Sequence, residues 1–182
     1  MCLIAWMNYQ GAKAVFKASG SGRAAEAIAK YSKDKDARFI TRTIRLFGAR
    51  KDGQLADASL ASLYEARAGL TKNPLDYSKA SVLYRSAASW PITEEERASL
   101  YSCAISCAAQ AKNKILASGI IRVLRRDSIL SSISAEGAAP IYKASFSLNK
   151  AGFEVMAIEL YNLVAPALGC AAWPEIYSQQ EF

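Results

Sequence analysis

The chain has 182 residues, of which 52% are hydrophobic and 21% charged, and its formal net charge is +7. A chain of this length and apolar content can bury the core of one domain without metal ions or disulfides. It contains no histidine, which excludes Ser–His and Cys–His nucleophiles and removes the commonest zinc ligand. No apolar run approaches the ~20 residues that a membrane-spanning helix needs.

The positive charge is concentrated in the first half of the chain. Residues 1–91 carry 15 basic and 7 acidic side chains, whereas residues 92–182 carry 8 basic and 9 acidic ones. A basic half favours an acidic partner, which could be nucleic acid, an anionic membrane surface or an acidic protein.

The four cysteines are few and scattered, which is unlike a secreted disulfide scaffold and favours a reducing, cytoplasmic location. Cys103 and Cys107 lie four positions apart, on one face of a predicted helix. We interpret them as small buried residues, although the spacing could also supply half of a metal or redox site.

Nine helices are predicted in chain order, because apolar residues recur at three- and four-residue steps between proline and glycine breaks. The expected ranges are 3–18, 23–33, 36–49, 58–71, 75–89, 94–111, 113–126, 137–150 and 153–165. Asp57 or Ser59 can cap the fourth helix, and Thr93 to Glu96 form a T-x-x-E capping box before the sixth. No stretch shows sustained period-two alternation with β-branched residues, so no sheet is expected.

The expected fold is a single all-α domain with three regions. Residues 1–54 form basic N-terminal helices, residues 55–166 form helix pairs, and residues 167–182 form an irregular tail in which Trp173 packs back on the body. Short turns between helices of this length require neighbouring helices to pack antiparallel.

A spacing of small and large residues recurs between positions 60 and 165. The three sets, each spaced 0, 4 and 7, are Ala80/Tyr84/Ala87, Ala117/Ile121/Leu124 and Ala157/Tyr161/Val164. A tyrosine precedes each set at a nearly equal distance along the chain, namely Tyr64, Tyr101 and Tyr142. The interval from Ala80 to Ala117 is 37 residues, and the interval from Ala117 to Ala157 is 40 residues. Alanines let paired helices approach closely, and aromatic side chains fill the gap beside them.

This pattern resembles the tetratricopeptide repeat, over roughly three units. The resemblance implies antiparallel helix pairs stacked as a short solenoid, and an irregular helical bundle is the alternative. The units here are unequal and longer than the family's period of about 34 residues, and the signature glycine and closing proline are mostly missing.

The resemblance also implies a partner-binding groove lined by the first helix of each pair. By register, its residues would be Glu65, Lys72, Asn73, Ser102, Ser106, Gln110, Tyr142, Phe146, Asn149 and Lys150. Asparagine and lysine side chains can hydrogen-bond the backbone and carboxylates of an extended peptide. Phe146 would supply an apolar anchor, or else belong to the core.

Arginines form stripes on two predicted helices. Arg38, Arg42 and Arg45 lie opposite Ile40, Ile44 and Phe47 on the third, and Arg122 and Arg125 share one side of the seventh with Lys114. Arginine forks onto phosphates and carboxylates, so these residues could bind an anionic partner, whereas the simpler interpretation is a solvated helix face.

No catalytic constellation is found, so no enzymatic activity, cofactor or metal ion is expected. The predicted function is a protein–protein interaction module, such as an adaptor, a chaperone or a scaffold component, which binds a partner segment in the groove. The alternative is a basic protein that binds nucleic acid without sequence preference through residues 38–45. Self-association through exposed end helices is also compatible with the sequence.

Overall fold

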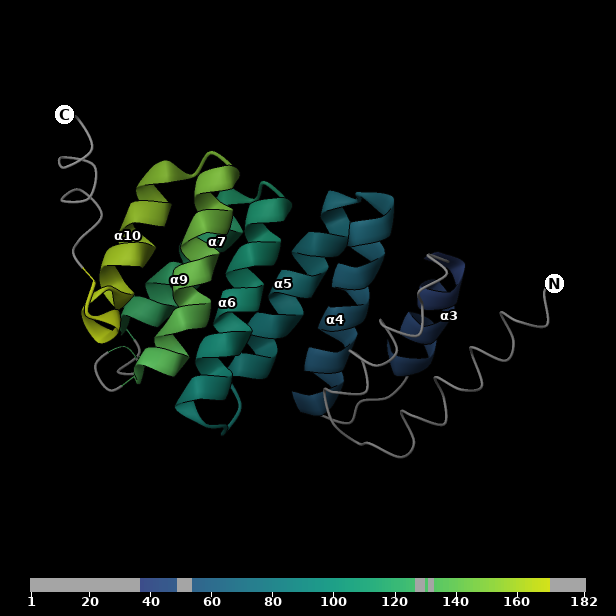
Figure 1. Ribbon diagram of the computed structural model, residues 1–182. Helices are drawn as coiled ribbons and strands as arrows, with labels where there is room; N and C mark the ends of the chain where they lie inside the picture. The colour runs from purple at the N-terminus through teal and green to yellow at the C-terminus, as the bar shows by residue number, and fades with distance from the viewer. Residues whose placement is uncertain (1–36, 49–53, 127–129, 131–132, 171–182) are drawn as a thin grey trace. The chain divides into compact units, whose positions relative to one another are not determined.

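The computed structural model describes residues 37–48, 54–126, 130 and 133–170, and every regular element among them is helical (Figure 1). The all-α class predicted from sequence is therefore confirmed for this part of the chain. The chain divides into two compact units, Met1–Ala87 and Ala88–Phe182. The helices expected at 3–18 and 23–33, and the tail with Trp173, lie outside the described residues.

The first unit contains α3 (Ala37–Gly48), α4 (Gln54–Thr71) and α5 (Pro74–Ala88). α3 packs against α4 through Ile40 and Ile44, which are 1% and 7% exposed and form a cluster with the fully buried Leu63. Pro74 begins α5, because a proline at the first helical position lacks only an N–H that has no partner within the helix.

The start of α4 differs from the sequence prediction. The helix begins at Gln54 rather than at position 58, so neither Asp57 nor Ser59 is its cap. Asp57 lies in the first turn, where a negative charge favours the helix dipole, and its carboxylate accepts a hydrogen bond from Ser86 Oγ of α5 at 2.7 Å. Ser59 is buried.

An ion pair between the half-buried Arg67 and the buried Asp76 connects the helices of the first unit. The Arg67 guanidinium on α4 donates two hydrogen bonds to the Asp76 carboxylate on α5, at 2.7 and 2.6 Å. It donates a third to Thr41 Oγ1 on α3 at 3.2 Å, and its central carbon lies 5.2 Å from the centre of the Tyr64 ring. The hydrogen bond with Asp76 raises the pKa of Arg67 above its ordinary value, although burial opposes this. Asp76 is only 3% exposed, so this bidentate pairing replaces most of its hydration.

The second unit contains α6 (Glu94–Gln110), α7 (Lys114–Arg126), α9 (Ala135–Lys150), α10 (Glu154–Val164) and the 3-10 turn η2 (Pro166–Leu168). α6 packs against α7 and α9, α9 packs against α10, and α7 also contacts α10 (Figure 1). The predicted capping box is confirmed, because Thr93 and Glu96 exchange side-chain and backbone hydrogen bonds before α6. Ser134 caps α9 by accepting a hydrogen bond from the N–H of Gly137.

Small residues allow α6 and α9 to approach closely. Ser102 Oγ on α6 donates a hydrogen bond to the backbone carbonyl of Pro140 on α9, at 2.6 Å. A methyl group on Gly137 would lie 2.8 Å from Ile133 Cγ1, so a larger residue there would require the Ile133 side chain to move, whereas it would make an ordinary contact of 3.5 Å with Glu95 Cγ of α6. Pro140 itself lies inside α9, where it removes one helical hydrogen bond.

The three helical hairpins reverse direction at equivalent turns. Lys72, Lys112 and Gly152 have φ angles of 56°, 52° and 85°. The interval from residue 72 to residue 112 and the interval from residue 112 to residue 152 are both 40 residues, and we call this interval the hairpin period.

Hydrogen bonds close each of these turns. The N–H groups of Lys112 and Asn113 donate back to carbonyls in the last turn of α6, both at 2.9 Å, and the same pair of bonds follows α9. After α4 a single bond of 2.7 Å joins the N–H of Lys72 to the carbonyl of Ala68. These bonds satisfy carbonyls that the helix ends would leave unpaired.

Burial follows the same period. Ile40, Ala80, Ile120 and Leu160 are at most 1% exposed, and Ile44, Tyr84, Leu124 and Val164 are at most 7% exposed. In this register α3 corresponds to the second helix of a pair, like α5, α7 and α10.

The register differs in one respect from the one inferred from sequence. The hairpin period pairs Ala80 with Ile120, whereas the sequence motif paired Ala80 with Ala117. The motif was displaced because a helix returns to nearly the same face after three or four residues. All nine residues of the sequence motif are nevertheless buried, at no more than 6% exposure.

We expect Asp76→Ala to lower the free energy of unfolding by about 3 kcal/mol, because it leaves the Arg67 charge without its partner in a half-buried position. Glu159→Ala is the matched control, since it breaks the more exposed ion pair between Arg125 and Glu159 and should cost less than about 1 kcal/mol. Urea denaturation measures both values. Equal losses from the two substitutions would contradict the structural importance of the Arg67–Asp76 pair.

Candidate partner-binding surfaces

One face of α6 and α9 remains open to solvent, and we call it the α6/α9 face. Its residues are Glu96, Ser99, Cys103, Ser106 and Gln110 on α6, and Glu136, Ala139, Lys143, Phe146 and Lys150 on α9, all half-buried or exposed. Each α6 residue precedes its α9 counterpart by one hairpin period. α6 and α9 lie side by side and run in the same direction, so both stripes face the same side (Figure 1).

Four of the predicted groove residues lie on this face: Ser106, Gln110, Phe146 and Lys150. Phe146 is 46% exposed, and its ring meets that of Tyr142 edge to face at 4.9 Å between centres. The Tyr142 ring in turn lies 5.4 Å from that of Tyr161, which is buried. Phe146 is therefore exposed to solvent but held in position by an aromatic neighbour anchored in the core.

The buried Tyr161 lies behind the Tyr142 and Phe146 rings. Burial raises the pKa of Tyr161 above its ordinary value, and the nearby Cys170 and Tyr142 act in the same direction. The Tyr161 hydroxyl thus stays protonated at neutral pH, and the cluster offers an apolar base for the exposed ring.

Other predicted groove residues make structural contacts. Ser102 is 8% exposed and lies under α9, so it does not line the open face. Glu65 accepts a hydrogen bond from the Tyr84 hydroxyl at 2.8 Å. Asn73 Oδ1 accepts one from the N–H of Leu75 at 3.0 Å, at the start of α5. Lys72 and Asn149 are exposed where α4 and α9 end.

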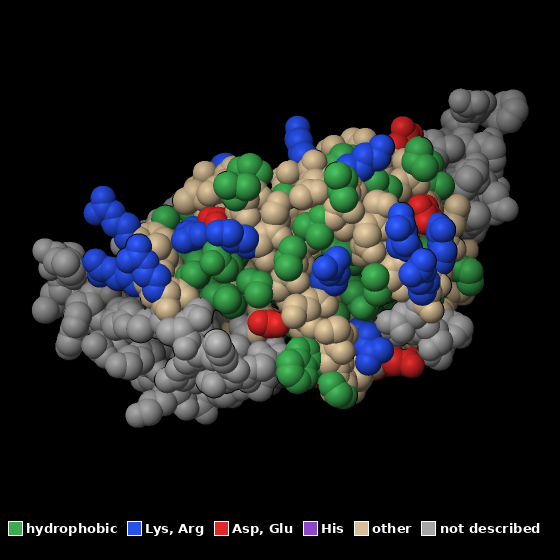
Figure 2. Space-filling model, turned by 180° about the vertical axis from the view of Figure 1, so that it is seen from behind, with side chains coloured by type: hydrophobic (Ala, Val, Ile, Leu, Met, Phe, Trp, Pro, Cys, Tyr) green, Lys and Arg blue, Asp and Glu red, His purple; other side chains and the backbone are tan. Residues whose placement is uncertain are grey.

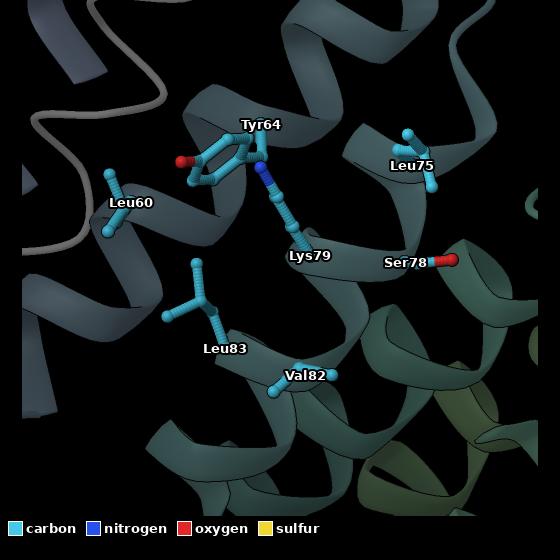
Figure 3. Close-up of a pocket in the computed structure, with 7 residues that line it drawn as sticks. All are labelled: Leu60, Tyr64, Leu75, Ser78, Lys79, Val82 and Leu83. Carbon is cyan, nitrogen blue, oxygen red and sulfur yellow. The ribbon is translucent and has the colours of Figure 1, made fainter. Parts of the chain in front are cut away.

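An apolar hollow of about 490 Å³ opens between α4 and α5 in the first unit (Figure 3). It is lined by Leu60, Tyr64, Leu75, Ser78, Lys79, Val82 and Leu83. The Lys79 ammonium lies 5.5 Å from the centre of the Tyr64 ring, which supplies the hollow with one cation. Sequence reasoning missed this site, because it depends on how two helices pack and no residue pattern along either helix marks it.

The arginine stripes are solvent-exposed, as the periodicity predicts. Arg38, Arg42 and Arg45 are exposed on the side of α3 opposite its two buried isoleucines. On α7, Arg122 and Arg125 are exposed, and Arg125 pairs with Glu159 of α10. The two stripes occupy equivalent positions on their helices, because Arg42 precedes Arg122, and Arg45 precedes Arg125, by two hairpin periods.

Cys103 is half-buried and Cys107 is fully buried, and they are not joined by a disulfide. Within residues 37–48, 54–126, 130 and 133–170, no group of three or more metal-ligating side chains comes together. In the same ranges, no helix has the length and apolar character needed to cross a membrane.

No protein-family model matches the chain, and comparison with curated proteins and with solved structures found no match.

Proposed function

We propose that the protein is an interaction module that binds a segment of a partner protein on the α6/α9 face. The observation that carries this proposal is Phe146, a large aromatic side chain that is 46% exposed while its neighbour Tyr142 anchors it to the core. Exposed aromatic residues with a fixed orientation are the usual energetic centres of protein interfaces, because they bury a large area at a small entropic cost.

The helix arrangement of the second unit supports a stack of antiparallel pairs similar to tetratricopeptide repeats. α6 and α9, the first helices of their pairs, contact each other, and so do the second helices α7 and α10. In such a stack the first helices line one surface on which an extended partner can lie. The hairpin period makes each pair longer than that family's unit of about 34 residues.

The charges on the face suggest what the partner segment carries. Glu96 and Glu136 lie where α6 and α9 begin, whereas Lys143 and Lys150 lie on the second half of α9. A segment with an apolar side chain at Phe146 and carboxylates toward Lys150 would be complementary. Ser106 and Gln110 can exchange hydrogen bonds with the backbone of such a segment.

Peptides selected from a random display library against the wild-type protein should bind Phe146→Ser at least about tenfold more weakly, because the apolar anchor is lost. Trp90→Ser is the matched control, since Trp90 is another exposed aromatic side chain, at 43%, and lies outside the α6/α9 face. Titration calorimetry with the selected peptides measures the affinities. Unchanged affinity for Phe146→Ser, or an equal loss for Trp90→Ser, would contradict binding on the α6/α9 face.

A second candidate function, sequence-neutral nucleic-acid binding, is favoured by the exposure of Arg38, Arg42 and Arg45 on one side of α3. Three guanidinium groups on one helical stripe can contact successive phosphates of a backbone.

Under this candidate function, a labelled random duplex should bind the wild-type protein at low salt and weaken steeply as salt rises. Changing Arg38, Arg42 and Arg45 together to Glu should abolish binding, whereas changing all three to Lys should preserve most of it and its salt dependence. Fluorescence anisotropy at two salt concentrations measures these effects. An unbound duplex at low salt, or undiminished binding by the glutamate variant, would exclude this function for α3.

A further inference from the structure

Three residues stand out as the most exposed large hydrophobic side chains that the structure describes. Leu75, Ile115 and Val155 are 67%, 87% and 79% exposed, whereas no other large hydrophobic side chain whose burial the structure describes exceeds 46%. Each is the second residue of the helix that follows a hairpin turn, and successive members lie one hairpin period apart. Single exposed apolar residues are ordinary, but repetition at one structural position indicates a shared role.

Lysines accompany these residues in the same turns. Lys112 and Lys114 flank the α6–α7 turn, Lys150 ends α9, and Lys72 lies in the α4–α5 turn, all exposed. The one exposed carboxylate among these turn residues is Glu154, at the start of α10. The turns of the second unit therefore combine three lysines and one glutamate with two exposed apolar side chains, Ile115 and Val155, which we call the apolar tips.

Both turns of the second unit lie at the same end of its helices, because α6 and α9 run in the same direction and α7 contacts α10 (Figure 1). We call this end, with Lys112, Lys114, Ile115, Lys150 and Val155, the turn edge. Figure 2 shows the molecule from behind, where hydrophobic and basic side chains lie near one another on the surface.

We infer that the turn edge, which shares only Lys150 with the α6/α9 face, docks on an anionic lipid surface. Ile115 and Val155 would enter the boundary between headgroups and acyl chains, while the lysines would reach the lipid phosphates. The aliphatic stems of the lysines can accompany the apolar tips, because only the ammonium group must remain in water.

A lipid surface fits these residues better than a protein partner does. An amphipathic helix in a groove would need a continuous apolar stripe, whereas the turn edge offers one tip from each of two helices. A folded partner would need two apolar pockets placed to receive Ile115 and Val155. A bilayer is fluid and accepts separate tips without shape complementarity, and a net positive edge matches an anionic leaflet. In the first unit, Leu75 and Lys72 repeat the same combination within their own hairpin.

The full chain should sediment with phosphatidylcholine vesicles that contain phosphatidylserine, and should stay in solution with pure phosphatidylcholine. The double variant Ile115→Ser/Val155→Ser should bind the anionic vesicles about tenfold more weakly, because both apolar insertions are lost. The double variant Lys112→Glu/Lys114→Glu should lose binding as well. Val123→Ser is the control, since Val123 is exposed on α7 but lies outside the turn edge, and its loss should leave vesicle binding unchanged.

Failure of the wild-type protein to sediment with anionic vesicles at low salt would overturn the inference. So would equal vesicle binding by wild type and Ile115→Ser/Val155→Ser, or an equal loss for Val123→Ser. Insertion itself is tested with Ile115→Trp, whose fluorescence difference from wild type should shift to the blue on anionic vesicles. Competition by polyglutamate without such a shift would identify an acidic protein surface as the partner and overturn the lipid assignment.

Discussion

Each described hairpin depends on one residue in the left-handed backbone region where its first helix ends. At Lys72, Lys112 and Gly152 the chain bonds back onto the helix that it leaves and then reverses direction. For an ordinary L-residue this conformation costs about 1–2 kcal/mol, so the two lysines are held there by the hydrogen bonds and by the packing of the following helix. Because the turns recur at a constant interval, equivalent residues of successive hairpins meet equivalent surroundings.

Residues one hairpin period apart have similar burial, both in the core and on the surface. A residue such as Ile120 is buried at the same helical position as Leu160, and the exposed Ile115 corresponds in the same way to Val155. Within each unit, a different interaction holds neighbouring helices together. In the second, Ser102 donates directly to the backbone of α9 and thereby brings two helices close together. In the first, the Arg67–Asp76 pair joins α4 to α5 through charge-assisted hydrogen bonds.

Much of the local structure could be predicted from the sequence. Helical periodicity and the capping box at Thr93 placed the described helices within a few residues, and the arginines of α3 are exposed opposite buried isoleucines as predicted. The turn positions could not be found in this way, because lysines at 72 and 112 do not signal a positive φ. Ser102 was assigned to the groove because register alone cannot distinguish an open face from one that a neighbouring helix covers. The hollow beside Tyr64 likewise depends on packing between helices.

The most direct test of this account is the change in the free energy of unfolding on Lys112→Gly, measured by urea denaturation beside Lys143→Gly. Glycine adopts a positive φ without a steric penalty, so Lys112→Gly should stabilise the protein by about 0.5–1 kcal/mol. Lys143 lies within α9, where the same substitution should destabilise it by about 1 kcal/mol. Opposite signs would support a left-handed turn at the position that the hairpin period requires. A loss of stability in both variants would contradict it.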